Sequence, residues 1–116
     1  MNLAIVGSRE LVDYEWFKSQ VNQFIQDYGN PNMIISGGAK GADTLARMFA
    51  NEMKIPIKEF IPDWSIGRHA GILRNTDIIK ESTHVLAFPS NNGKGTQDSI
   101  AKAKQMNKIG RIIYID

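Results

Sequence analysis

The stretch that decides the fold covers residues 33–53 and has the sequence MIISGGAKGADTLARMFANEM. Its first three residues form a short apolar run that is typical of a buried strand. A glycine-rich segment follows, and Leu45, Phe49 and Met53 then lie on one stripe of a predicted helix. A strand, a glycine-rich turn and an amphipathic helix make up one half of a βαβ unit, so the stretch predicts a parallel sheet.

The same alternation of apolar runs and helical patterns continues in both directions along the chain. Asp13 and Gly29 are typical start and stop signals for the first predicted helix. The sequence predicts strands at 3–6, 33–35, 55–60, 84–88 and 111–115, and helices at 14–28, 41–53, 67–80 and 96–106. Because five strands and four helices in 116 residues leave no room for another domain, we expect one α/β domain over residues 1–116, with a five-stranded, mostly parallel sheet.

The composition excludes several functional classes. The chain has 14 basic and 12 acidic residues, and this balance argues against a duplex-DNA partner. The absence of cysteine excludes disulfides and thiolate chemistry. The two histidines, His69 and His84, have no partner at metal-ligand spacing, so no metal site is expected. No apolar run is long enough to span a bilayer and no signal peptide is visible, so the expected location is cytoplasmic.

The segments that follow the predicted strands indicate where a ligand binds. In open parallel sheets, ligands bind at the carboxyl ends of the strands. The segments at that edge are 7–9, 36–43, 62–64 and 89–96, and the second and fourth are glycine-rich and lead into helices. Glycine lets the backbone approach a ligand, and a helix N-terminus attracts phosphate. The alternative is that these glycines only make tight turns. Because neither G-x-x-x-x-G-K-[ST] nor G-x-G-x-x-G is present, Walker-type ATPases and the usual NAD register are not expected.

Several side chains near these segments are candidates for ligand contact, and each also has a simpler structural role. Arg74, beside Asn75 in the third predicted helix, would point a guanidinium at a phosphate or form an internal salt bridge or loop hydrogen bond. Trp64 would stack on a base or anchor its loop. Asp43 would accept from a ribose hydroxyl, although capping the preceding loop is the simpler role.

The most specific expectation places the phosphate between the helix N-termini that begin at Gly41 and Thr96. Arg9 or Arg74 is then its charged partner, and the glycines nearby leave room for it. A valine at Gly38 is expected to block the ligand while keeping the fold, provided that φ at this residue is negative. The predicted ligand-binding residues are Gly7, Ser8, Arg9, Gly37, Gly38, Lys40, Gly41, Asp43, Trp64, Arg74, Asn75, Pro89, Gly93, Gly95 and Thr96.

Taken together in this order, the same segments resemble the YspA/YpsA-related branch of the SLOG superfamily of Rossmann-like proteins. The segments that carry the resemblance are Val6-Gly7-Ser8-Arg9, Ser36 to Asp43, Asp63-Trp64, Ala70 to Asn75, Ala87-Phe88-Pro89 and Gly95-Thr96. The resemblance implies a three-layer sandwich with strand order 3-2-1-4-5. It also implies a nucleotide or nucleotide-derived ligand, such as an ADP-ribose-like molecule, with no further cofactor. Relatives often pair, which leaves a homo-oligomer open.

The resemblance also implies two alternative functions. Lonely Guy enzymes release the base from a nucleoside monophosphate, and they resemble residues 89–99 through a P-G-G-x-G-T-x-x-E motif. Here the loop is longer and Ser99 stands at the position of the catalytic glutamate, so Asp98 and Arg74 are the remaining catalytic candidates. DNA-processing protein A binds single-stranded DNA. The missing glutamate argues against enzyme activity, and the near-neutral charge argues against a binder of single-stranded nucleic acid. The sequence therefore favours a nucleotide-binding module that senses or sequesters its ligand.

Overall fold

A computed structural model describes residues 1–91 and 93–115. The strands are β1 (Asn2–Gly7), β2 (Met33–Ser36), β3 (Ile57–Glu59), β4 (His84–Phe88) and β5 (Ile109–Ile112). The helices are α1 (Tyr14–Tyr28), α2 (Ala42–Met53), α3 (Ala70–Glu81) and α4 (Lys94–Gln105), with a short 3₁₀ turn, η1 (Trp64–Ile66). No helix within the described ranges has the length and apolar character needed to cross a bilayer.

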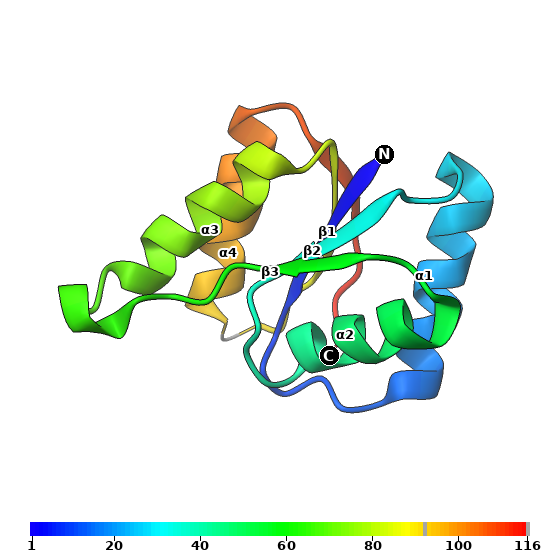
Figure 1. Cartoon of the computed structure of the whole chain (residues 1–116), viewed down its shortest axis with the longest axis horizontal. Coiled ribbons are helices and arrows are strands. Elements are labelled where there is room, and N and C mark those ends of the chain that lie inside the picture. Colours follow the sequence, from blue (N-terminus) through cyan, green and yellow to red (C-terminus); the bar gives the residue numbers. More distant parts are fainter. Residues whose placement is uncertain (92, 116) are drawn as a thin grey trace.

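The five strands form one parallel sheet in the order β3-β2-β1-β4-β5, as the resemblance implied. Helices cover both faces of the sheet, with α1 and α2 on one side and α3 and α4 on the other (Figure 1). The α/β Rossmann-like sandwich is therefore confirmed. The strand order changes direction between β1 and β4, whose carboxyl ends lie side by side because Gly7 is paired with Phe88.

The core consists of two apolar clusters separated by the sheet. Alternate residues of β1 point to opposite faces, so Leu3 and Ile5 pack against α1 and α2, whereas Ala4 and Val6 pack against α3 and α4. These four side chains are at most 5% exposed. Burial on both faces explains why the central strands are continuous apolar runs in the sequence.

Helix α1 begins and ends where the sequence predicted. The Asp13 carboxylate accepts a hydrogen bond from the backbone N–H of Trp16 at 3.1 Å, and Gly29 ends the helix with φ at 102°. A positive φ of this size suits glycine, which has no Cβ to clash. Phe17, Val21 and Phe24 on the predicted stripe are buried, which confirms the periodicity.

Several predicted boundaries were wrong, among them those of the third helix, the fourth helix and the last strand. The third helix starts at Ala70 rather than residue 67, because Gly67 ends the separate turn η1 by donating its N–H to the Trp64 carbonyl. Helix α4 starts at Lys94, two residues before the expected start. Strand β5 ends at Ile112, although the apolar residues continue to Ile115. The backbone N–H groups of Ile113 and Ile115 still donate to the carbonyl oxygens of Ala87 and Pro89, at 2.8 and 3.1 Å.

Candidate ligand-binding site

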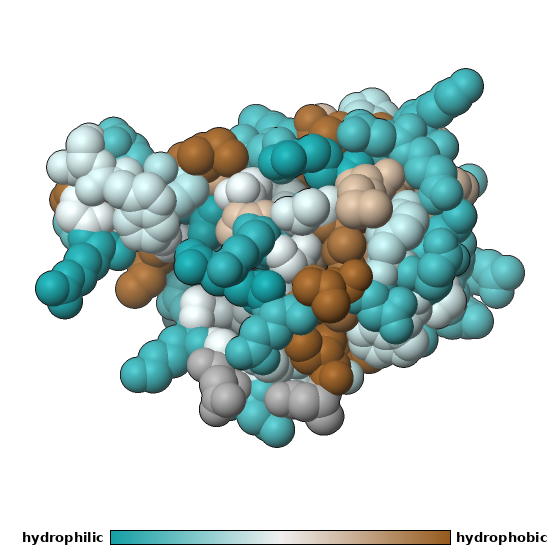
Figure 2. Space-filling view, turned by 90° about the horizontal axis from the view of Figure 1, so that it is seen from below, coloured by the Kyte–Doolittle hydropathy of each residue, from teal (hydrophilic) through white to brown (hydrophobic). Residues whose placement is uncertain are grey.

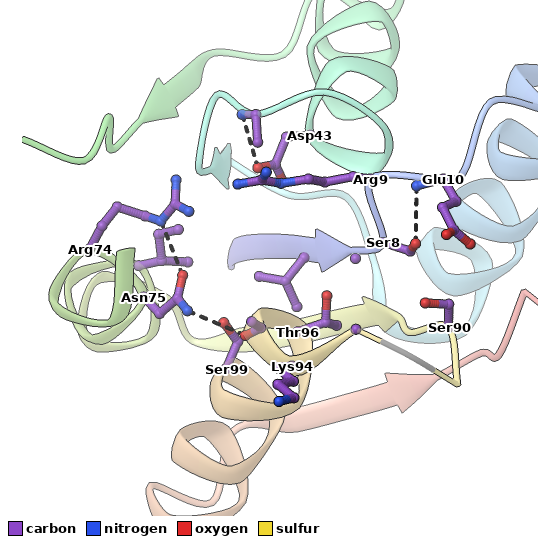
Figure 3. Close-up of a pocket in the computed structure, with 16 residues that line it drawn as sticks. Ser8, Arg9, Glu10, Asp43, Arg74, Asn75, Ser90, Lys94, Thr96 and Ser99 are labelled. Atoms are coloured by element: carbon purple, nitrogen blue, oxygen red, sulfur yellow. Dashed lines mark hydrogen bonds between the residues drawn. The ribbon is translucent and has the colours of Figure 1, made fainter. Parts of the chain in front are cut away.

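A pocket of about 310 Å³ opens at the carboxyl edge of the sheet, beside the end of β1. Its walls come from the loop after β1, the middle of α3, the start of α4 and the loop between β2 and α2 (Figure 3). Figure 2 views the molecule from this edge and shows that hydrophilic residues cover much of it. The pocket brings together nine of the predicted residues, namely Gly7, Ser8, Arg9, Asp43, Arg74, Asn75, Gly93, Gly95 and Thr96.

The first turn of α4 opens directly onto this pocket. Gly93 is the N-cap residue and makes no side-chain capping hydrogen bond, and Lys94, Gly95 and Thr96 line the pocket beyond it. The first N–H groups of a helix have no partner within the helix and carry partial positive charge. The start of α4 is therefore suited to an anionic group.

Three buried hydroxyls lie around the same helix start. Ser90, Thr96 and Ser99 line the pocket and are 3%, 8% and 2% exposed. Their side chains form no hydrogen bond with any other residue in ranges 1–91 and 93–115. A Cβ at Gly93 would lie 3.3 Å from Ser90 Oγ and 3.7 Å from Thr96 Oγ1, so the missing side chain leaves space between two hydroxyls. These hydroxyls line the cavity, where they are available to a ligand.

Arg74 projects from α3 into the other side of the pocket. Its Nη1 donates to the carbonyl oxygens of Gly37 at 2.5 Å and Phe60 at 3.3 Å, and its Nε donates to Asn75 Oδ1 at 3.0 Å. Burial lowers the pKa of the guanidinium, the nearby charge of Asp43 raises it, and the nearby charge of Arg9 lowers it. The expected loop hydrogen bond is thus present. Among described residues no carboxylate lies within 4.0 Å of this guanidinium, so the charge is half-buried without an ion-pair partner.

Asn75 joins the two sides of the pocket. Besides accepting from Arg74, the buried Asn75 side chain donates to the Gly95 carbonyl at 3.3 Å and to Asp98 Oδ2 at 3.2 Å. One amide therefore ties the Arg74 guanidinium to the first turns of α4. Asp98 itself is paired with Lys102 at 2.7 Å and does not line the pocket.

Asp43 lines the pocket on the α2 side and is 9% exposed. Its Oδ2 accepts the N–H of Ala39 at 3.1 Å, which is the loop-capping role expected from the sequence. Burial raises the pKa of this carboxyl, and the Ala39 N–H, the charge of Arg74, the Ser36 hydroxyl and the Gly37 N–H partly offset that effect. Asp43 is thus a buried carboxylate that its surroundings compensate incompletely.

The expected pairing of two helix N-termini does not match the structure. Gly41 is absent from the pocket wall, and the first N–H of α2, from Ala42, donates to the Ser8 carbonyl at 3.0 Å. A Cβ at Gly41 would collide with the backbone of Ser8 and Arg9, and φ there is 79°. The loop after β1 therefore covers this end of α2, leaving the α4 terminus as the one that faces the pocket among described residues.

Five further predicted residues lie outside the pocket wall: Gly37, Gly38, Lys40, Trp64 and Pro89. Trp64 is 56% exposed and packs over Gly71 of α3, so it serves its own loop. Figure 1 shows that loop at the far end of α3, and it stands out from the rest of the face in Figure 2. Gly38 has a φ of 70°, so the condition attached to its valine substitution is not met.

The pocket also contains residues that the sequence analysis did not select. Glu10, Ser90, Lys94 and Ser99 line it, together with apolar atoms of Val6, Ala39 and Ile78. Ser90 and Lys94 belong to the glycine-rich segment after β4 and were available from that signal. Ile78 lies one helical turn after Arg74, on the same side of α3, so helical spacing from Arg74 would have found it.

Comparisons with known proteins agree with this architecture. The Gene 61 protein of Mycobacterium phage D29 is 32% identical over 80 residues, which are 63% of this chain and 64% of that protein. The structure of DNA processing protein A from Helicobacter pylori, described for its single-stranded DNA binding mode, superposes with a TM-score of 0.66 at 19% identity. That match covers 98% of this chain and 64% of the other, and it shows the shared fold. The chain thus spans less than two thirds of either relative.

The sequence profile of the YspA, cpYpsA-related SLOG family matches residues 1–67. The matched region contains β1, β2 and β3, and the segments after β1 and β2 form one side of the pocket. It includes the Gly7-Ser8-Arg9 and Ser36 to Asp43 segments on which the sequence resemblance rested. Because this match covers more than half of the chain, the chain belongs to the YspA, cpYpsA-related SLOG family.

Proposed function

We propose that this domain binds a nucleotide or nucleotide-derived ligand, with a phosphate group held against the first turn of α4. The observation that carries the proposal is the convergence of that free helix start with the buried hydroxyls of Ser90, Thr96 and Ser99. Hydroxyl and N–H donors that point at one cavity suit the oxygens of a phosphate.

The charge around the pocket supports an anionic ligand. Arg9 and Arg74 both line the pocket, and neither forms an ion pair with a carboxylate in the described part of the chain. A half-buried guanidinium without a counter-ion is costly, and a bound phosphate would relieve that cost. The pocket thus offers two guanidinium groups to an anionic ligand.

The arrangement favours binding over glycosidic hydrolysis. Asp98, the candidate catalytic carboxylate, is engaged by Lys102 and Asn75 and does not line the pocket. Ser99, which does face the pocket, cannot act as a carboxylate does. We therefore propose a sensor or sequestering module rather than a phosphoribohydrolase.

Calorimetric titration with inorganic phosphate and with AMP, GMP, CMP and UMP tests the proposal. At least one nucleotide should bind, and Thr96→Val, which removes a pocket hydroxyl while keeping its shape, should weaken that binding several-fold. Thr76→Val is the matched control, because Thr76 lies on α3 outside the pocket and its hydroxyl donates to the Ile72 carbonyl. Equal affinities of the two variants, or no binding by any nucleotide, would refute the proposal.

A single-stranded nucleic acid is a second candidate ligand, favoured by exposed cations at the same edge. Arg9, Lys40 and Lys94 are exposed and form no salt bridge with other described residues. The structural neighbour DNA processing protein A is described as binding single-stranded DNA. This candidate predicts oligonucleotide affinity that falls steeply with salt, whereas affinity for mononucleotides alone would exclude it.

A further inference from the structure

We infer that Asp43 determines ligand specificity, by accepting hydrogen bonds from the ribose hydroxyls of a nucleoside 5′-monophosphate. This inference rests on the proposed function, because it takes the α4 side of the pocket as the phosphate end. It adds the class of nucleotide and the residue that selects it.

The two sides of the pocket differ in chemistry. Ser90, Thr96 and the α4 N-terminus offer hydrogen-bond donors, whereas the opposite side holds Asp43, a carboxylate that accepts only, near the guanidinium groups of Arg74 and Arg9. Figure 3 shows Asp43 across the end of β1 from Thr96 and Ser99. A ligand that satisfies both sides carries an anionic group at one end and hydroxyl or amino donors at the other.

Asp43 retains capacity to accept such donors. The loop-capping bond from Ala39 uses Oδ2, and the Ser36 hydroxyl and the Gly37 N–H also act on the carboxylate, but its two oxygens together offer about four acceptor positions. The carboxylate is buried, so a donor that reaches it makes a bond stronger than in water. Burial already raises the pKa of Asp43, which is the behaviour of a charge that lacks sufficient partners.

The donors on a nucleotide that reach Asp43 first are ribose hydroxyls. In a nucleoside 5′-monophosphate the sugar adjoins the phosphate directly and the base lies beyond it. The pocket volume of about 310 Å³ is at the lower end of the range of about 300–1,000 Å³ for small-molecule sites. A cavity of this size accommodates a phosphate and a sugar, with the base toward the opening, and it is too small for a longer polyphosphate in the same place.

The experiment titrates the unmodified chain with the best-binding ribonucleoside monophosphate and with its 2′-deoxy, 3′-deoxy and 2′,3′-dideoxy forms. Loss of hydrogen bonds to a carboxylate should weaken the dideoxy form about tenfold or more. The diphosphate and triphosphate should also bind more weakly than the monophosphate. Asp43→Asn should reduce both differences, whereas Asp77→Asn, at an exposed position of α3, should reduce neither.

The outcomes separate this inference from the proposed function. If no phosphate ester binds, both are refuted. If the monophosphate and its dideoxy form bind the unmodified chain equally, or if the triphosphate binds more tightly, the role of Asp43 is refuted while phosphate binding stands. Because the analogue series on the unmodified chain decides this by itself, a failure of Asp43→Asn to fold does not prevent the test.

Discussion

Replacing Arg74 with methionine should lower the melting temperature by about 8 °C. The substitution keeps an unbranched side chain but removes the donors to the Gly37 and Phe60 carbonyls and to Asn75. Each such bond contributes a net 0.5–1.5 kcal/mol or so, and relief of a half-buried charge offsets part of the sum, which leaves a loss of about 2 kcal/mol. With an unfolding entropy of about 2.1 cal/mol/K per residue, 116 residues give about 0.24 kcal/mol/K. Dividing the loss of about 2 kcal/mol by this entropy gives the predicted shift in melting temperature.

Differential scanning calorimetry measures this shift without any ligand. The matched control is Arg47→Met on α2, since Arg47 pairs with Glu59 at the surface and exposed ion pairs contribute little. A small shift for Arg47→Met and a large one for Arg74→Met is the expected result. If Arg74→Met melts no lower than Arg47→Met, the hydrogen bonds of Arg74 do not hold the loops at the pocket.

Three further predictions concern the same edge of the sheet. Burial raises the pKa of Asp43 in the folded chain, so the unmodified protein should lose stability as pH rises from about 3.8 through that raised pKa. Asp43→Asn does not titrate there, so its stability relative to the unmodified protein should increase over this pH range. Urea titrations at a series of pH values measure the difference. Gly93→Ala, at a negative φ and between two buried hydroxyls, should weaken nucleotide binding about tenfold in calorimetry with little change in melting temperature. Gly41→Ala should lower the free energy of unfolding more than Gly29→Ala, as measured by urea titration. Both substitutions impose about 1–2 kcal/mol of strain at a positive φ. An added Cβ at Gly41 also collides with backbone atoms, whereas at Gly29 it meets nothing within 4 Å.

Hydrophobic periodicity was sufficient to predict the sequence of strands and helices along the chain. It identified the α1 stripe and the buried central strands, because burial alone selects those residues. It could not predict that residues 67–69 would lie outside α3, since Gly67 ends the 3₁₀ turn at a φ of 118° and that turn depends on Asp63, whose carboxylate accepts from the Ser65 N–H at 3.1 Å. Such local bonds compete with helix formation and leave no apolar signal.

The site was predicted at the level of segments but less well at the level of side chains. The glycine-rich segments do meet at one edge of the sheet. Gly41, however, lets the start of α2 approach the backbone of Ser8 and Arg9 closely, and it does not contact the pocket. Sequence alone does not distinguish these uses, because both require a residue without a Cβ. Trp64 was selected for its chemistry, and its distance from the pocket depends on the path of a loop that no periodicity describes.

The strand order has a consequence for how this chain is made. Strand β1 is the first to be synthesised, yet one of its two neighbours, β4, begins at residue 84, and Leu3 is paired with His84. Until that segment leaves the ribosome, β1 has an unpaired apolar edge, of the kind that recruits other chains. Contacts that span so much of the sequence also form slowly. We therefore expect the sheet to close only after residues 84–88 have been synthesised, which makes the nascent chain more prone to aggregation than the folded domain.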